Sequence, residues 1–456
     1  MALSLTSPNP LRPIPAMLYH TNPMKNGNAI GILDCNNFFV SCERAVNPAL
    51  NERPVVVLSH NDGCVISRSD EVKAMGVKMA QPLFQVRKML EQHNTAIISS
   101  NHSLYRQYAE QIHDLLIEDL GKQVVELYSI DEAFLDLGPP DKLVMLGKHL
   151  KKIIFDATNI PVSVGLAETK TLAKVANHIA KTSAKTQGVL DLYGSRFTDL
   201  ALRQTPIGDV WGVGPRSAVK LKAKGLNTAL DLKQTKPDTV RGDMTIFGSR
   251  TVLELNGIKC MPLELSERLS KSIAHTRTFG KPIRSYEEVR KAIIFFTTRV
   301  LEKMRWNDLQ TRTVTVFLNT DRFRPDFYSR AHSYRSVYHS DVTSEIYGWV
   351  DLCLDETFVD GMEFKKAGVI LSDLQRSSVV APRLFDGRGF DRQHHLMRSM
   401  DELNMRYGRD VVHFAALNVE GKWQGQTEHR LNDENHNVGR DAIGKGQMFR
   451  RSIRFM

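Results

Sequence analysis

The sequence predicts a multidomain α+β protein whose first domain is a ferredoxin-like sheet. Short apolar runs indicate buried strands, and apolar residues spaced three and four apart indicate helices between them. The expected order is strand, helix, two strands, helix, strand and helix, at 29–33, 101–120, 124–130, 133–137, 141–157, 161–166 and 169–181. This is the order of a split βαβ sheet.

Other segments flank this sheet. A hairpin is expected where a strand at 54–58 enters an Asp-Gly turn and extended structure resumes at 64–66. The chain becomes helical after 183, and 270–376 combines a helix at 286–304 with strands at 312–319 and 367–371. Beyond 377 a polar stretch with a helix at 391–405 ends in basic residues, which suggests a docking tail.

Length and charge narrow the class of protein. At 456 residues the chain has room for about three or four domains of roughly 150 residues. A hydrophobic fraction of 42% supports packed cores, and a net charge of +10 favours a polyanionic partner such as nucleic acid. A merely basic soluble protein is the alternative, because net charge informs about association and not about fold.

Cysteine usage and hydropathy predict a cytoplasmic protein. The five cysteines show no C-x-x-C spacing and are expected to be free thiols in a reducing compartment. No apolar run approaches the roughly 18 residues of a membrane span, so no membrane partner is expected. Residues 1–27, rich in Pro, Asn and Ser, are expected to be a disordered leader.

Three carboxylates are candidates for a metal site. Asp34 ends the first strand, and Asp131 and Glu132 form the tip between two later strands. In a split βαβ sheet the end of the first strand can lie beside that tip. With the backbone carbonyl of Cys35, these oxygen donors suit two Mg²⁺ ions that still require substrate phosphates as ligands. A solvated acidic turn and an isolated Asp remain the alternative.

Basic residues near these acids suggest a triphosphate site. Lys170, Lys174 and Lys181 fall close to one face of the helix at 169–181. Arg68 and Lys73 follow the Asp-Gly turn and are suited to phosphate, Arg as a bidentate fork and Lys as a point charge. A solvated helix face is the alternative for each lysine.

Phe38 and Phe39 come shortly after Asp34, within reach of a sugar bound there. A ring in that place can pack under a deoxyribose and exclude a 2′-hydroxyl. The alternative for both residues is ordinary core packing.

The Gly212-Val-Gly214 turn, followed by Lys220, Lys222 and Lys224, has the form of a helix-hairpin-helix. The amides of such a turn can bind a DNA phosphate without reading bases. A plain helical turn is the alternative.

Several sequence runs together resemble the Y-family translesion DNA polymerases. They are LDCNNFFVSCE at 33–43, SHNDGCVISR at 59–68, YSIDEAFLD at 128–136, VGLAETKTLAK at 164–174 and VWGVG at 210–214. Further likeness lies in KAGVILSD at 366–373 and MDELN at 400–404. The resemblance runs from about residue 29 to the end of the chain.

This resemblance implies a right-hand architecture. It implies a palm at 28–37 and 101–182, small fingers at 38–100, a helical thumb at 183–265, a little finger at 270–376 and a partner-docking tail at 377–456. It also implies that Asp34, Asp131 and Glu132 bind metal, that Phe39 is the steric gate, and that Arg68, Lys73 and Lys174 bind the triphosphate.

The resemblance further implies the biological setting. Primed DNA template and dNTPs are the expected substrates, and processed UmuD dimer and the RecA filament are the expected partners in the SOS response, at the nucleoid in the cytoplasm. The family's sliding-clamp peptide is expected at Ala381–Phe385, where its usual opening glutamine is missing. Relatives usually carry tyrosine at the places of Phe39 and Asp70.

Two hypotheses about function follow. The first is an error-prone, template-directed DNA polymerase that transfers nucleotides by two-metal catalysis. The second is a catalytically weak DNA-binding accessory protein that docks repair partners. A two-metal nuclease is a weaker third hypothesis.

Overall fold

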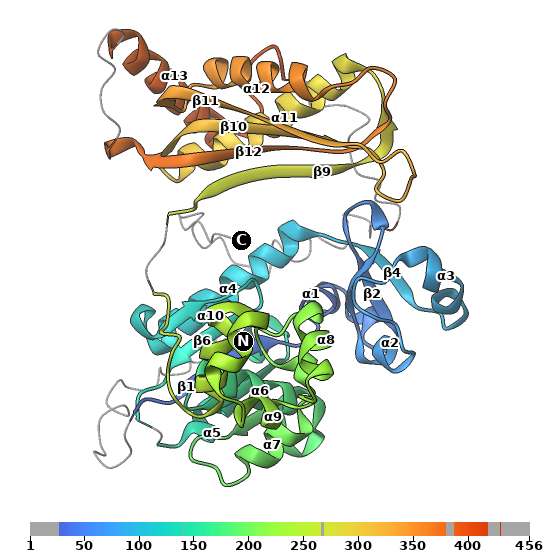
Figure 1. Ribbon diagram of the computed structural model, residues 1–456, viewed down its shortest axis with the longest axis vertical. Coiled ribbons are helices and arrows are strands. Elements are labelled where there is room, and N and C mark those ends of the chain that lie inside the picture. The colour runs from blue at the N-terminus through green and yellow to red at the C-terminus, as the bar shows by residue number, and fades with distance from the viewer. Residues whose placement is uncertain (1–26, 140, 266–268, 380–386, 418–428, 430–456) are drawn as a thin grey trace, which may run out of the picture. The chain divides into compact units, whose positions relative to one another are not determined.

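The computed structural model divides the chain into two compact units (Figure 1). The first comprises residues 1–59, 64–267 and 430–456, and the second comprises residues 60–63 and 268–429. The structure describes residues 27–139, 141–265, 269–379, 387–417 and 429. The predicted leader, clamp peptide and basic C-terminal end therefore lie outside the described residues.

The first unit is built on a five-stranded sheet with the order β5-β6-β1-β7-β8. Its strands are β1 (Ile30–Cys35), β5 (Val125–Leu127), β6 (Glu132–Asp136), β7 (Val162–Ala167) and β8 (Val189–Asp191). β1 lies antiparallel between β6 and β7, and β8 adds a parallel edge beside β7. Without β8 this is the ferredoxin-like order, so the predicted fold class is confirmed.

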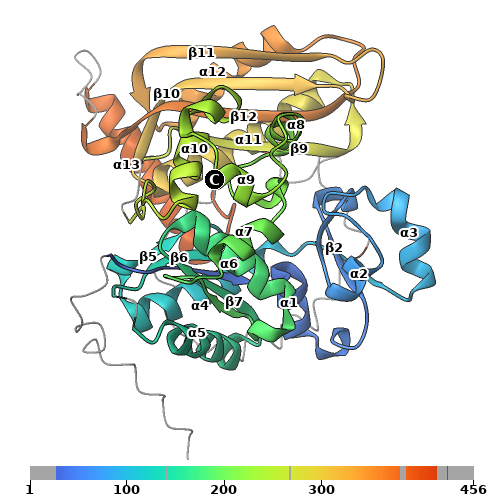
Figure 2. The same ribbon diagram turned by 60° about the horizontal axis from the view of Figure 1, so that its bottom comes forward.

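Helices cover both faces of this sheet, as Figure 2 shows. The helices α4 (His102–Leu120) and α5 (Leu143–Thr158) lie on one face, and α6 (Lys170–Thr182) lies on the other. All six residues of β1 are buried, because alternate side chains enter the two cores.

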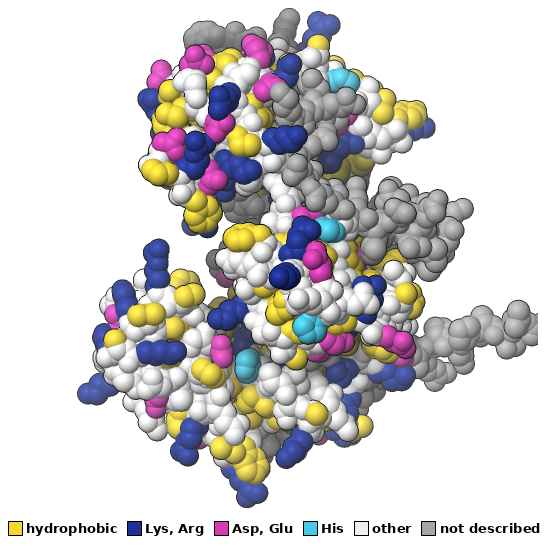
Figure 3. All heavy atoms as spheres, turned by 90° about the vertical axis from the view of Figure 1, so that its right-hand side faces the viewer, with side chains coloured by type: hydrophobic (Ala, Val, Ile, Leu, Met, Phe, Trp, Pro, Cys, Tyr) yellow, Lys and Arg dark blue, Asp and Glu magenta, His cyan; other side chains and the backbone are white. Residues whose placement is uncertain are grey.

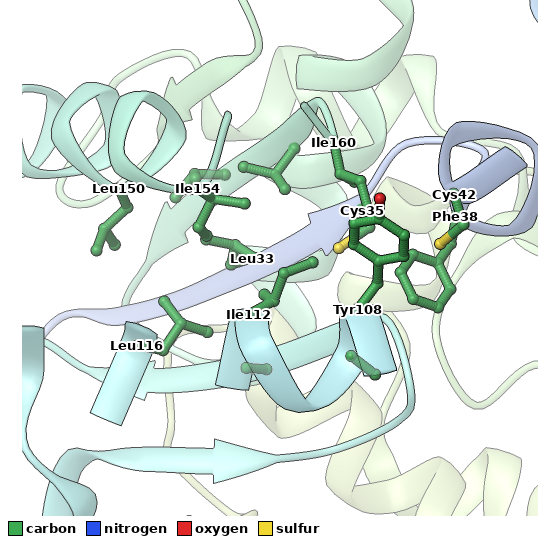
Figure 4. Packing of buried hydrophobic residues seen from close by; sticks show 14 of the residues in the cluster. Leu33, Cys35, Phe38, Cys42, Tyr108, Ile112, Leu116, Leu150, Ile154 and Ile160 are labelled. Atoms are coloured by element: carbon green, nitrogen blue, oxygen red, sulfur yellow. The ribbon is translucent and has the colours of Figure 1, made fainter. Parts of the chain in front are cut away.

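The face of each β1 side chain decides where the functional groups point. Leu33 and Cys35 pack with residues of α4 and α5 (Figure 4), whereas Ile30 and Ile32 pack with residues of α6. Asp34 shares the parity of Ile32, so its carboxylate faces α6.

α6 approaches the sheet closely because β7 carries a glycine. A Cβ atom on Gly165 would lie 2.2 Å from the carbonyl oxygen of Ala173 and 2.3 Å from the amide nitrogen of Asn177. The helix is capped by Thr169, whose side chain accepts a hydrogen bond of 3.3 Å from the amide of Leu172. Gly165 therefore sets the distance of α6 from the sheet, and Thr169 sets the residue at which the helix begins.

A smaller sheet with the order β3-β2-β4 is inserted after β1. It contains β2 (Val55–Leu58), β3 (Val65–Arg68) and β4 (Ala96–Ser99), with helices α1 (Phe38–Val46), α2 (Asp70–Ala74) and α3 (Leu83–Gln92). β2 and β3 are antiparallel, which confirms the predicted hairpin, and β4 is a parallel strand that was not predicted.

A helical module completes the first unit, in agreement with the predicted change at 183. Its helices are α7 (Thr198–Gln204), α8 (Pro215–Ala223), α9 (Ala229–Lys233) and α10 (Pro237–Leu255). Apolar residues of these helices share one core with those of α6. The module is therefore packed directly against the helix that faces Asp34.

The second unit is a four-stranded sheet with helices on one face (Figure 1). Its elements are β9 (Ser272–Ile283), α11 (Tyr286–Trp306), β10 (Leu309–Asn319), β11 (Ser329–Ser340), α12 (Thr343–Thr357) and β12 (Phe364–Arg376). The predicted helix and two strands of this segment are confirmed. The strands β9 and β11 were not predicted, because few of their side chains are buried. The helix α12 was not predicted either.

The predicted helix near 391–405 is present as α13 (Gly387–Tyr407). It joins the second unit through an ion pair of Arg305 Nε with Asp401 Oδ2 at 2.6 Å and a 2.5 Å hydrogen bond between His394 Nδ1 and Asp341 Oδ2, among other contacts. This unit thus continues past 377, where a separate tail was expected.

Two further sequence expectations can be compared with the structure. All five cysteines are free, as predicted. Among the described residues, no helix combines the length and the apolar character that a membrane span requires.

Replacing Gly165 with Ala should lower the free energy of unfolding by about 3 kcal/mol, because the new Cβ collides with the backbone of α6 and the helix must shift. Gly242 in α10 is a matched control, since a Cβ there meets nothing within 4 Å. Urea unfolding followed by circular dichroism measures both variants. Equal stability of G165A and G242A would contradict this account of the packing.

Candidate active site

The predicted carboxylates are brought together by strand register. Asp34 lies directly opposite Glu132 in the antiparallel pair of β1 and β6. The amide of Cys35 donates a 2.9 Å hydrogen bond to the carbonyl of Asp131, which holds the tip against the end of β1. All three acids therefore come from one corner of the sheet.

Side chains of α6 face this corner. Lys181 Nζ lies 2.5 Å from Asp34 Oδ1, and Lys174 Nζ lies 2.6 Å from Glu132 Oε1. Asn177 Nδ2 donates to Asp34 Oδ2 at 3.4 Å. Asn177 was not predicted as a site residue, although its spacing from the two lysines places it on their helix face.

Lys170 does not belong to this group, which corrects the predicted row of three lysines. Its side chain is 4% exposed, and its Nζ lies 2.5 Å from Glu126 Oε2 and 3.0 Å from the carbonyl oxygen of Pro262. Glu126 also accepts a 2.9 Å hydrogen bond from the amide of Glu264. This buried ion pair fastens the segment after α10 to the sheet and leaves Lys170 unavailable to a triphosphate.

Burial shapes the charge state of the acids. It raises the pKa of Asp34 to about 7, although Lys181 opposes the shift. Burial also raises the pKa of Asp131, against the 2.7 Å hydrogen bond that Ser129 Oγ donates to its Oδ1. For Glu132, burial disfavours the charged form, but Lys174 and the hydrogen bond with Asp34 outweigh it and lower the pKa.

The donor set fits a hard divalent cation. Three clustered carboxylates in a buried corner favour added positive charge, and oxygen ligands are those that Mg²⁺ prefers. Within the described ranges, no three His, Cys, Asp or Glu side chains stand as a ready metal-binding group, and Asp34 and Glu132 each form an ion pair with a lysine. Ligation by these residues remains a prediction.

Cys35 enters this set only through its backbone. Its side chain is 2% exposed and lies beside Phe38, Cys42 and Tyr108 in the core (Figure 4). Burial raises the pKa of the thiol well above its usual value, so a thiolate ligand is disfavoured. The carbonyl oxygen is the remaining candidate ligand.

The predicted phosphate-binding residues of the inserted sheet differ in their surroundings. Arg68 closes β3, and its Nε and Nη1 are buried with no hydrogen-bond partner among the residues that the structure describes. Lys73 Nζ instead lies 2.8 Å from Asp70 Oδ1, which also accepts from Asn37 Nδ2 at 3.1 Å. Arg68 thus has donors suited to an anion, whereas Lys73 must leave Asp70 to bind one.

The two predicted sugar-contacting rings have different environments. Phe39 is half-buried and stacks on Tyr105 with ring centroids 4.5 Å apart. The Tyr105 hydroxyl donates a 2.7 Å hydrogen bond to Glu43 Oε1, which holds the Tyr105 ring in place beneath Phe39's stacking contact. Phe38 is 4% exposed and belongs to the core, the alternative considered for it, so it offers little surface to a substrate.

The predicted glycine turn lies immediately before α8. Gly212 has a φ of 87°, which favours glycine, and Gly214 is the residue that precedes the first turn of α8. A Cβ on Gly214 would meet nothing within 4 Å. The turn thus has open space beside it, and phosphate binding there remains a prediction.

Comparison with known proteins identifies the family. Residues 33–178 match the model of the impB/mucB/samB family, and residues 270–383 match that of its C-terminal domain. The chain is 35% identical to the protein UmuC of Salmonella typhimurium over 404 residues, which span 87% of this chain and 95% of UmuC. The chain belongs to the impB/mucB/samB family.

Other members and solved structures agree with this assignment. The chain is 36% identical to ImpB of Salmonella typhimurium, with coverage of 87% of this chain and 95% of ImpB. A structure of a Y-family DNA polymerase chimera of Dbh and Dpo4 covers 76% of this chain and 99% of its own, with a TM-score of 0.62 and 20% identity. The predicted Y-family right-hand fold is thus confirmed. The predicted class of DNA-directed DNA polymerase agrees with a relative of that name, the DNA polymerase IV of Desulfatibacillum aliphaticivorans, which is 28% identical over 86% of this chain and 97% of its own length.

The last family match concerns the C-terminal part of the chain. Residues 394–430 match a domain of unknown function. Part of this match is α13, which packs in the second unit.

Glu43 should make the stability of this family member depend on pH. Burial raises the pKa of Glu43 to about 7 from a usual 4.5. Between these two pH values the folded protein keeps a proton on Glu43 that the unfolded chain has released. Raising the pH from 4.5 to 7 should therefore cost about 3 kcal/mol of stability, which is retained at lower pH. Glu43→Gln keeps an acceptor for Tyr105 and should remove this dependence.

Urea unfolding of the two proteins at pH 5 and pH 8 measures the effect. The stability of E43Q relative to the unmodified protein should be greater at pH 8 than at pH 5. A difference that does not change with pH would show that Glu43 is not the titrating group.

Proposed function

We propose that this chain is an error-prone, template-directed DNA polymerase that performs translesion synthesis in the SOS response by two-metal nucleotidyl transfer. The observation that carries the proposal is the pairing of Asp34 with Glu132 beside Asp131, in a corner faced by Lys174 and Lys181. A buried group of acids opposed by lysines is suited to a cation bound to a polyphosphate.

In the proposed reaction the primer 3′-oxygen forms a bond to the α-phosphorus of a dNTP. The bond between the α-phosphorus and the bridging oxygen breaks, pyrophosphate leaves, and the hydroxyl proton passes to solvent. Two Mg²⁺ ions, held by Asp34, Asp131, Glu132 and the Cys35 carbonyl, supply Lewis-acid activation when bound.

The protein's own side chains orient the nucleotide. Lys174 and Arg68, whose Nε and Nη1 have no hydrogen-bond partner among the described residues, bind phosphate oxygens, and Lys73 adds a more mobile positive charge. Phe39, held against Tyr105, lies where the sugar is expected and excludes a 2′-hydroxyl.

Surface charge bears on how DNA is held. On the face drawn in Figure 3, Lys and Arg side chains are interspersed with acidic and apolar ones. Binding through the backbone amides at Gly212 and Gly214 needs no dense patch of positive charge. The glycine turn is therefore a proposed contact for the phosphate backbone of the duplex.

The accessory-protein hypothesis is less favoured. A scaffold that only docks repair partners has no need for three carboxylates in one partly buried corner, where their charge is costly. The nuclease hypothesis lacks a separate supporting feature.

The proposed partners and location rest on the family likeness. They are primed DNA and dNTPs, processed UmuD and the RecA filament, with activity at the nucleoid in the cytoplasm. Clamp binding through 381–385 is a further proposal, which a binding assay with purified clamp and a Leu384→Ala variant would test.

Replacing Asp131 with Ala should reduce Mg²⁺-dependent primer extension by about a thousandfold or more, because metal ions contribute several kcal/mol to such a transition state. Labelled dNTP and primed template, with UmuD and RecA supplied, provide the assay. Asp156→Ala is the control, since this exposed acid on α5 pairs, among the described residues, only with Lys152. If the D131A variant extends primers normally, the catalytic assignment is refuted. If the unmodified protein binds DNA but extends no primer, the accessory-protein hypothesis is favoured.

Replacing Phe39 with Ala should raise the ratio of ribonucleotide to deoxyribonucleotide incorporation by about tenfold to a hundredfold, because the ring that meets the 2′-hydroxyl is removed. Single-nucleotide insertion kinetics with matched rNTP and dNTP measure this ratio. Phe155→Ala on α5 is the control and should leave this ratio unchanged, because Phe155 is 49% exposed. If F39A incorporates ribonucleotides and deoxyribonucleotides in the same ratio as the unmodified protein, Phe39 serves only in core packing.

A further inference from the structure

The ammonium group of Lys174 lies over two aromatic rings. Its Nζ is 5.0 Å from the ring centroid of Tyr128 and 5.6 Å from that of Phe134. The lysine side chain is 15% exposed, so these contacts lie in a partly desolvated place where cation–π attraction is effective. Glu132 is its only ionic partner among the described residues.

The position of Tyr128 is fixed by the backbone of the acidic tip. The amides of Tyr128 and Ser129 both donate to the carbonyl of Glu132 at 3.1 Å. Tyr128 therefore moves together with the residue that carries the carboxylate partner of Lys174. Its ring packs edge-on against the fully buried Phe134 with centroids 5.2 Å apart.

Trp211 joins this group from the helical module. Its indole Nε1 donates a 3.2 Å hydrogen bond to the Tyr128 hydroxyl. The ring centroid of Trp211 lies 5.8 Å from that of Tyr128 and 5.5 Å from that of Phe134. Trp211 directly precedes Gly212, the first glycine of the predicted phosphate-binding turn.

We propose that Tyr128 and Trp211 are positioning residues that hold the Lys174 ammonium group in place for the dNTP triphosphate. This inference rests on the proposed polymerase function. A lysine has a long flexible stem, so it loses rotamer freedom when it binds a phosphate. Rings that restrict it beforehand reduce this loss and strengthen nucleotide binding.

Trp211 extends the effect to the helical module. Since Trp211 contacts Tyr128 and directly precedes the glycine turn, DNA bound at the turn and triphosphate bound at Lys174 share one chain of contacts. Any coupling between the two is reciprocal, so primed DNA should strengthen dNTP binding as much as dNTP strengthens DNA binding.

Steady-state insertion kinetics of the full chain test the proposal. Replacing Tyr128 with Leu should raise the KM for dNTP about fivefold and leave kcat within about twofold, because the contact concerns nucleotide binding. Y128F keeps the ring and should restore a KM close to that of the unmodified protein. W211L should raise the KM in the same direction as Y128L. Y193L, which removes a tyrosine that bonds the Gly27 carbonyl elsewhere in the unit, should not change it.

A double-mutant cycle separates positioning from general damage to the fold. If Tyr128 acts through Lys174, then Y128L should have almost no further effect on KM in a K174M background. An equal rise in both backgrounds, a fall in kcat at constant KM, or the same rise in Y193L would overturn the proposal.

The outcome can be distinguished from failure of the polymerase assignment. An unmodified protein that extends no primer would overturn the proposed function. Equilibrium binding of Mg²⁺-dATP would still test the positioning role, since Y128L should weaken this binding about fivefold. Equal binding by Y128L and the unmodified protein would refute it.

Discussion

The register between β1 and β6 is the constraint on which the candidate site depends. Because side chains alternate along a strand, a slip of one residue would turn Asp34 from the α6 face into the core of α4 and α5. That core is filled by Leu33 and Cys35, so the slip would bury a carboxylate without a partner and turn apolar groups toward the lysines of α6. Hydrophobic packing on both faces thus specifies where the acid stands.

Helix α6 supplies the second half of this arrangement. Gly165 allows the helix to lie close to the sheet, and that closeness brings Lys174 and Lys181 within ion-pair distance of Glu132 and Asp34. In a buried corner each ammonium offsets the cost of an ionised carboxylate. The lysines that are suited to bind phosphates therefore also stabilise the acids that are suited to bind metal.

The sequence was informative where local pattern decides the structure. The apolar runs that end at Asp34 and flank Asp131 and Glu132 predicted the corner of the sheet, and Thr169 marked the start of α6. Helical periodicity placed Lys170 beside Lys174, but it could not reveal that Glu126 on β5 pairs with Lys170. The stack of Phe39 on Tyr105 likewise depends on residues far apart in sequence, as does the hydrogen bond between Tyr105 and Glu43, which are 62 positions apart.

The guanidinium of Arg68 is suited to bind an anion, but it lowers the stability of the fold. Two of its nitrogens are buried with no protein partner in the part of the chain that the structure describes, and such groups lower the stability of a fold. A phosphate oxygen would satisfy them, so under the proposed function nucleotide binding would raise the stability of the small inserted sheet. An apolar residue at the end of β3 would avoid this cost, but it would offer no donor to an anion.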